Sequence, residues 1–259
     1  MKNSFLQLQW THRYQEKMGH GSMNLTMRTP FTYDYSYLQG EWVHQHSWKK
    51  LAFHWRGFAR LGMGHEIPKE SALFLAGGNP EEMMESKFTR SQGFIPLDWS
   101  GFSTDQFSHV HAGGGLNLRG YTGYYAIDEQ AGIKYINYKG KSGASLNLEI
   151  DFDGYLPFRP KYLRDYVHLD SYLFGDAGII NRGALNTNLL SSYAPVDSWS
   201  KVRADAGIGF AFTLKKMGPL EKISPFILRL DIPFFISAPP YADPNEFDVR
   251  WIIGVGRSF

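Results

Sequence analysis

The sequence predicts an all-β protein, namely an antiparallel transmembrane β-barrel, or the C-terminal strands of one, that carries a long re-entrant loop. First, short segments in both halves of the chain alternate apolar and polar residues, which is the period of a strand with two different faces. Second, the mean hydropathy is −0.34, and no apolar run comes near the about 18 residues of a spanning helix. Barrel strands need only about 9–11 residues, half of them polar. Third, aromatic residues make up 16% of the chain, and strands and membrane interfaces both favour them.

Composition excludes several functional classes. A formal net charge of +2, with both signs interspersed, gives no signature of nucleic-acid binding, and we expect no nucleic-acid partner. The chain has no cysteine, which excludes disulfides, zinc-thiolate sites and cysteine nucleophiles. Residues 1–7 lack the apolar core of a secretory signal. We therefore expect that a signal was removed or that the chain is part of a longer protein.

The N-terminal part, residues 1–62, contains four segments with strand periodicity. Three of them alternate cleanly, and the fourth, 33–46, is less regular because its tyrosines share a parity with polar residues. The apolar residues of the clean segments fall on one parity each: Leu6, Leu8 and Trp10; Met23, Leu25 and Met27; Leu51, Phe53, Trp55, Ala59 and Leu61.

Residues 63–141 break this rhythm with a Gly-Gly pair, three prolines and an acidic, methionine-rich patch at 81–85. A connection of this length is usually functional. We expect it to be a long external or re-entrant loop.

Strand periodicity returns in the C-terminal part, residues 142–259, at 143–155, 166–178, 201–214, 225–235 and 247–259. A soluble β-sandwich would also alternate. However, the face opposite the apolar stripe carries Gly, Arg and Asp in one strand after another, which is typical of a barrel lumen. We therefore treat residues 1–259 as a single β-barrel domain.

Connection lengths predict the orientation of this barrel. Outer-membrane barrels have short periplasmic turns and long external loops. Here the connections alternate between longer ones (236–245, 179–199, 63–141) and shorter ones (215–222, 156–163, 47–50). We expect a bacterial outer-membrane protein with a periplasmic C-terminus and contacts to membrane lipid. The odd number of expected strands, nine, predicts that the barrel is incomplete at its N-terminal side.

Residues 112–122 begin with a glycine run and continue as Leu118-Arg119-Gly120-Tyr121. This stretch resembles the Arg-Gly-Phe/Tyr loop motif of the BamA and two-partner-secretion transporter superfamily of outer-membrane barrels. Three further stretches occur in matching order at 148–150, 174–178 and 202–209. The resemblance covers about 112–259 well and 1–62 only by pattern.

The resemblance implies that the loop re-enters the barrel and that Arg119 bonds to Glu149 and Asp176 on the inner wall. Phe174 would pack beside them, and Gly120 and Tyr121 complete the motif. Both acids lie on the polar parity of their strands. A buried guanidinium needs carboxylate partners, and its fork suits two acceptors. The alternative is that Arg119 is a solvated loop charge.

The last strand, with Trp251, Ile253, Val255 and Phe259 on one parity, looks like the recognition signal of barrel-insertion machinery. That machinery is therefore an expected partner. The alternative is an ordinary edge strand that ends in phenylalanine.

Signals for catalysis are weak, and we predict no enzyme, no metal and no cofactor. The pairs His44/His46 and His109/His111 would each lie on one strand face, as a metal site requires, but neither has an evident third ligand. His65-Glu66 lacks the second histidine of a zinc helix, and 113–120 lacks the lysine of a phosphate loop.

The resemblance implies insertion of outer-membrane proteins or translocation of a polypeptide substrate. No substrate-gathering repeats precede the barrel in this sequence, which is a departure from that family. Two alternatives remain open. One is a barrel that anchors or exports a fused upstream domain, since 76–80 and 113–121 look similar to barrel tails of some bacterial membrane zinc aminopeptidases. The other is a passive pore or structural barrel.

Overall fold

The computed structural model describes most of the chain, and all statements below concern that part. The described residues are 4–65, 67–68, 70–85, 109–122, 127–130, 133–136, 139–155, 166–181, 199–215, 226–237, 247 and 249–259.

One ten-stranded sheet dominates the fold, and its strand order is β1-β2-β3-β4-β10-β11-β12-β13-β14-β6. Its long strands are β1 (Phe5–Glu16), β2 (Gly19–Pro30), β3 (Tyr35–Trp48), β4 (Leu51–Gly64), β10 (Ser142–Asp151), β11 (Val167–Asn181), β12 (Arg203–Leu214) and β13 (Phe226–Ile236). All neighbours pair antiparallel except the short strands β14 (Ile252–Val255) and β6 (Val110–His111), which pair in parallel. The predicted all-β, antiparallel barrel fold is confirmed.

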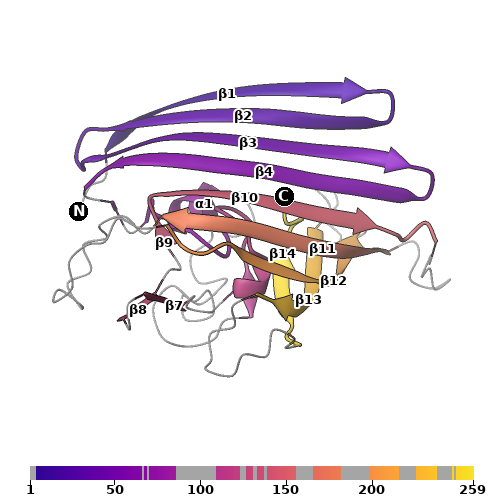
Figure 1. The fold of residues 1–259 in the computed structure, drawn as a ribbon. Helices are drawn as coiled ribbons and strands as arrows, with labels where there is room; N and C mark the ends of the chain where they lie inside the picture. The colour runs from indigo at the N-terminus through magenta and orange to yellow at the C-terminus, as the bar shows by residue number, and fades with distance from the viewer. Residues whose placement is uncertain are drawn as a thin grey trace.

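The connection between β4 and β10 contains short elements that return to the concave side of the sheet (Figure 1). They are β5 (Leu73–Phe74), α1 (Pro80–Glu85), β6, η1 (Arg119–Tyr121), β7 (Ile127–Gln130), β8 (Ile133–Ile136) and β9 (Lys139–Gly140). β5 pairs with β9, and β7 pairs with β8.

The convex face of the sheet is apolar and exposed. Residues of the parity predicted to face lipid have high exposure, for example 61% for Leu8 and 59% for Leu146. The other large apolar residues exposed on the long strands include Leu6, Trp10, Met23, Leu25, Met27, Leu38, Trp42, Leu61, Met63, Leu148, Leu173, Leu228 and Phe234. So large an apolar surface marks contact with a membrane. The sheet is therefore the wall of an outer-membrane barrel, and this face contacts lipid.

The concave face is polar and largely buried. Arg56, Asn147, Asp176, Arg203 and Asp231 all lie on this face and are at most 2% exposed. The less regular parity of 33–46 has the same explanation, because Tyr35 and Tyr37 are buried on the interior face and Glu41 pairs there with Arg56. No helix in the described part of the chain is long and apolar enough to span a membrane.

The C-terminal strand is shorter than predicted. β14 covers only Ile252–Val255, whereas the sequence predicts a strand over 247–259. Gly256 has φ of +87°, in the left-handed region that glycine adopts readily. The alternation therefore ends there, and the last residues turn toward the interior.

Candidate functional site

The segment 110–122, which we call the luminal segment, lies inside the curved wall. Its conformation depends on glycine at two positions. Gly115 has φ of +53°, and a Cβ at this residue would lie 2.5 Å from the Gly77 carbonyl oxygen. A Cβ at Gly120 would lie 2.5 Å from the Asp205 Cβ. The backbone of the luminal segment thus packs directly against the wall and against 77–78.

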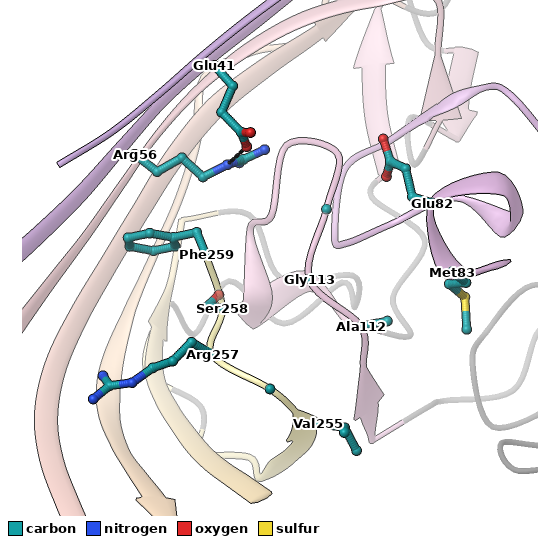
Figure 2. A pocket seen from close by; sticks show the side chains of 12 residues that line it. Glu41, Arg56, Glu82, Met83, Ala112, Gly113, Val255, Arg257, Ser258 and Phe259 are labelled. Atoms are coloured by element: carbon teal, nitrogen blue, oxygen red, sulfur yellow. Dashed lines mark hydrogen bonds and ion pairs between the residues drawn. The ribbon is translucent and has the colours of Figure 1, made fainter. Parts of the chain in front are cut away.

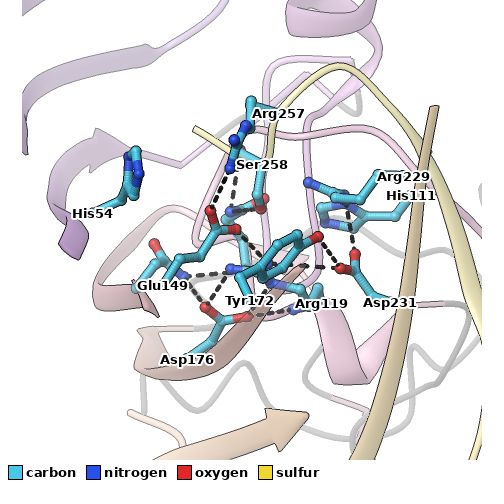
Figure 3. A network of polar contacts seen from close by, with 12 residues as sticks. His54, His111, Arg119, Glu149, Tyr172, Asp176, Arg229, Asp231, Arg257 and Ser258 are labelled. Atoms are coloured by element: carbon cyan, nitrogen blue, oxygen red, sulfur yellow. Dashed lines mark hydrogen bonds and ion pairs between the residues drawn. The ribbon is translucent and has the colours of Figure 1, made fainter. Parts of the chain in front are cut away.

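Arg119 is fully buried and bonds to two wall carboxylates (Figure 3). Its Nη1 donates to Glu149 Oε1 at 2.6 Å. Its Nε and Nη2 donate to the two oxygens of Asp176 at 2.8 and 3.1 Å, a bidentate pair. The guanidinium carbon lies 4.3 Å from the centroid of the Phe174 ring. The structure therefore brings together the predicted residues Arg119, Glu149, Phe174 and Asp176.

Charge around Arg119 is balanced by a larger network than the sequence indicated. Asp231 Oδ1 lies 3.9 Å from Arg119 Nη1, and Asp231 also pairs with Arg229 at 2.7 Å. Burial alone would lower the pKa of Arg119, but Asp176, Glu149 and Asp231 outweigh it and raise that pKa well above its ordinary value. Arg119 therefore remains charged in its buried position.

Asn147 and Arg56 hold the backbone of the luminal segment. Asn147 Nδ2 donates to the carbonyls of Leu116 and Asn117 at 3.3 and 3.0 Å. Arg56 Nη2 donates to the Gly115 carbonyl at 2.8 Å. Arg56 also binds Asn147 Oδ1 at 3.0 Å, so β4 and β10 act together on one stretch of backbone.

The C-terminal residues hold the opposite side of the luminal segment. Arg250 donates to the carbonyls of Gly120 and Thr122 at 2.8 and 2.7 Å. Asn117 Nδ2 donates to Ser258 Oγ at 2.7 Å. Tyr121 is buried, and its hydroxyl lies 3.1 Å from Ser237 Oγ. The segment is therefore bonded to β4 and β10 on one side and to residues that flank β13 and β14 on the other.

Helix α1 connects the luminal segment to the N-terminal strands. Asn79 and Glu82 form a capping box, since Asn79 Oδ1 accepts from the Glu82 amide and Glu82 Oε2 accepts from the Asn79 amide. Glu82 also pairs with Arg60 at 3.0 Å and accepts from the Gly115 amide at 3.0 Å. Glu81 pairs with Arg28 at 2.6 Å. Through these ion pairs and this hydrogen bond, the acidic patch of 81–85 connects β2 and β4 to the luminal segment.

A cavity of about 330 Å³ remains beside the luminal segment (Figure 2). Polar and charged side chains line much of it, including Glu41, Arg56, Glu82 and Arg257. The Phe259 side chain forms another part of the cavity wall. A polar pocket therefore lies between the luminal segment and the wall.

His111 lies in the same network and bonds to Arg229 through its Nδ1. On the other side of Asp231, the Tyr172 hydroxyl donates to Asp231 Oδ1 at 2.5 Å.

The residues of the predicted insertion signal do not share one environment. Trp251 and Ile253 are exposed, at 49% and 37%. Phe259 instead lines the cavity, 6.0 Å from the Arg119 guanidinium carbon, because the chain turns inward after Val255. The predicted common face of all these residues is therefore wrong for Phe259.

The two histidine pairs occupy different surroundings. His44 stacks on Trp55 at 4.5 Å between ring centroids, and His46 stacks on His44. His109 stacks on Trp251 at 3.9 Å, whereas His111 binds Arg229. Within the described residues neither pair belongs to a cluster with metal-binding geometry.

Sequence reasoning missed Asn147, Arg56, Arg60, Asp231 and Arg250 as partners of the luminal segment and α1. Their positions in the alternating pattern indicate that they point into the lumen, because charged and amide side chains lie on the polar face of a barrel strand. The pattern does not indicate which of these side chains contact one another.

Comparison with known proteins gives little further guidance. No protein-family model matches the chain, and no curated protein matches it. A similar solved structure is LpxR from Salmonella typhimurium, with a TM-score of 0.29 and 10% identity over 96% of this chain and 86% of that one. A likeness of this degree transfers no residue role and no activity.

These findings correct three expectations. No family model matches the chain, and the solved structure that the comparison gives is LpxR rather than a member of the BamA and two-partner-secretion superfamily, so the predicted family membership is wrong. The predicted role in protein insertion or polypeptide translocation is wrong for the same reason, and the anchor and passive-pore alternatives are not retained. The prediction that the chain is not an enzyme is also contradicted and is not retained.

Proposed function

We propose that this chain is the wall of an outer-membrane barrel whose lumen is closed by its own luminal segment, with Arg119 as the lock. The main supporting observation is the fully buried guanidinium bonded to both Glu149 and Asp176. A buried charge of this kind is stable only while its partners are in place. The lock therefore holds the segment in one position and keeps the interior occupied.

Hydrogen bonds along the segment support a closing role. Wall and tail side chains bind its backbone carbonyls at Gly115, Leu116, Asn117, Gly120 and Thr122. Backbone groups satisfied in this way need no water, so the segment is stable inside the barrel. A loop that only passed through the lumen would not require so many specific donors.

Accessibility labelling tests this proposal directly, since the chain has no native cysteine. Thr122 is 3% exposed, and Thr122→Cys should resist a membrane-impermeant maleimide in the folded, membrane-inserted protein. Adding Arg119→Ala should make the same introduced cysteine react, because the segment loses its lock. Thr11→Cys, at an exposed position of β1, is the matched control and should react in both backgrounds.

The proposal fails if the cysteine introduced at position 122 reacts fully while Arg119 is intact and the protein shows its folded, heat-modifiable migration on gels. It also fails if Arg119→Ala leaves that cysteine protected. Conductance in a planar bilayer gives an independent measurement, with a low value for the parent chain and a higher one for the Arg119→Ala variant.

We also propose that the C-terminus is periplasmic. The connections β1–β2 and β3–β4 are tight turns, whereas β4–β10 and β11–β12 are long. β14 runs antiparallel to β13, so it ends on the side of the tight turns, which are periplasmic in outer-membrane barrels. A cysteine added after Phe259 should not react with an impermeant maleimide in intact cells. One placed in the β11–β12 connection should react, and the reverse result would refute this orientation.

We further propose that Trp251 and Ile253, on the exposed side of the last strand, contact barrel-insertion machinery. Their apolar side chains are available to a partner, whereas Phe259 belongs to the interior. Replacing both Trp251 and Ile253 by serine should lower the amount of assembled protein in the outer membrane. Leu8→Ser on β1 is the control for a general loss of apolar surface.

A further inference from the structure

A second polar cluster lies on the concave face where β10 ends and β11 begins. Asp153 lies two residues after the end of β10, and His168 and Asp170 belong to β11. The register pairs Asp151 with Tyr172, so the next positions of the same parity bring Asp153 toward Asp170. One ligand atom of each of Asp153, His168 and Asp170 lies within 4.8 Å of the others.

Negative charge exceeds positive charge in this cluster. Among the described residues, the carboxylates of Asp151, Asp153 and Asp170 are offset by one guanidinium, that of Arg257. Arg257 Nη2 lies 3.1 Å from Asp170 Oδ2 and 3.5 Å from Asp151 Oδ2. Arg257 also lies 3.8 Å from Glu149, so its one charge is shared among several carboxylates, and the excess of negative charge favours a divalent cation.

One carboxylate of the cluster has an unused oxygen. Asp151 is 6% exposed, and its Oδ1 is buried with no hydrogen-bond partner in the described part of the chain. Asp153 is half-buried, and its carboxylate belongs to the same cluster. A buried carboxylate oxygen without a partner, such as Asp151 Oδ1, is costly, so a cation beside it would stabilise this end of the wall.

We propose that Asp153, His168 and Asp170 bind one divalent transition-metal cation, Mn²⁺ or Zn²⁺. One imidazole nitrogen with carboxylate oxygens suits these ions, whereas Ca²⁺ and Mg²⁺ prefer oxygen ligands alone. His168 Nε2 lies 2.9 Å from Asp170 Oδ1. This is close to the separation of about 3 Å between adjacent ligands of an octahedral ion with bonds of about 2.1 Å.

Arg257 has a positioning role in this site. It bonds to Asp170 Oδ2 and leaves Oδ1 facing His168. Outer-shell partners of this kind fix the orientation of a metal ligand and raise the affinity of the site. Arg119 takes no part, so this site and the lock of the luminal segment can be tested separately.

Mn²⁺ binding to the purified, folded chain in detergent is the experiment, followed by the loss of the electron paramagnetic resonance signal of free Mn²⁺ and by competition with Zn²⁺. We expect saturation at one ion per chain. Asp153→Asn and His168→Ala should each weaken binding at least about tenfold, because each removes a ligand. His20→Ala, at an exposed histidine of the β1–β2 hairpin, should leave the affinity unchanged.

Heat-modifiable migration on gels establishes that each variant is folded, and the isosteric Asp153→Asn decides the question if His168→Ala does not fold. An absence of saturable Mn²⁺ and Zn²⁺ binding to the folded chain would overturn the proposal. Equal affinities of the folded variants and the parent chain would also overturn it, as would binding of Ca²⁺ in preference to both ions.

Discussion

β1 and β11 have the same kind of sequence but different surroundings. Both alternate apolar and polar residues, and both expose apolar side chains on the lipid side. In β1, eleven of twelve residues are exposed, including those on the polar face. In β11 the inner face is buried from Tyr172 through Asp176 to Ile180, because it packs against the luminal segment.

This difference shows that two separate interactions stabilise the wall. Lipid contacts the apolar face of every long strand, and this contact is of the same kind in β1 and β11. The luminal segment acts on the other face, and among the described residues it reaches β4, β10 and β11 but not β1. Substitutions on the lipid face should therefore have similar effects in both regions, whereas those on the polar face should not.

The largest difference is expected at the polar face. Arg119→Ala leaves Glu149 and Asp176 buried without a cation, which should lower the free energy of unfolding by about 3–5 kcal/mol. Arg13→Ala, on the exposed polar side of β1, should change it by less than about 0.5 kcal/mol. Urea titration of the protein folded in lipid vesicles measures both. Equal effects of the two substitutions would show that the lock does not distinguish the two regions.

The lipid face should show no such contrast. Leu8→Arg on β1 and Leu146→Arg on β10 replace side chains of similar exposure, 61% and 59%. Each should cost about 2–4 kcal/mol if it lies near the membrane midplane. The same urea titration applies. A cost confined to Leu146 would mean that β1 does not lie against lipid.

A smaller contrast is expected between two tyrosines. Tyr172→Phe removes the donor of Asp231 Oδ1 inside the wall and should cost about 1–3 kcal/mol, because the carboxylate oxygen stays buried. The Tyr14 hydroxyl on β1 bonds to His44 at 2.8 Å in a half-buried position, where no buried carboxylate depends on it. Tyr14→Phe should therefore cost less than Tyr172→Phe. A larger loss for Tyr14→Phe would contradict the contrast.

Local sequence determined the strands and their two faces. The period of two in Leu6-Leu8-Trp10 or Leu146-Leu148 decides which side chains point to lipid, since successive residues of a strand point to opposite sides. The same rule placed Glu149 and Asp176 on the interior face. These are properties of adjacent residues, so the sequence by itself was sufficient.

Tertiary structure decided which polar residues meet. Arg119 contacts residues 30 and 57 positions away, and Arg250 reaches the Gly120 carbonyl across 130 positions. Such contacts depend on strand register, on the curvature of the sheet and on the path of the β4–β10 connection, none of which is set by local periodicity. For the same reason Phe259, placed with Ile253 by parity alone, lies in the interior, because one backbone turn at Gly256 ends the strand before it.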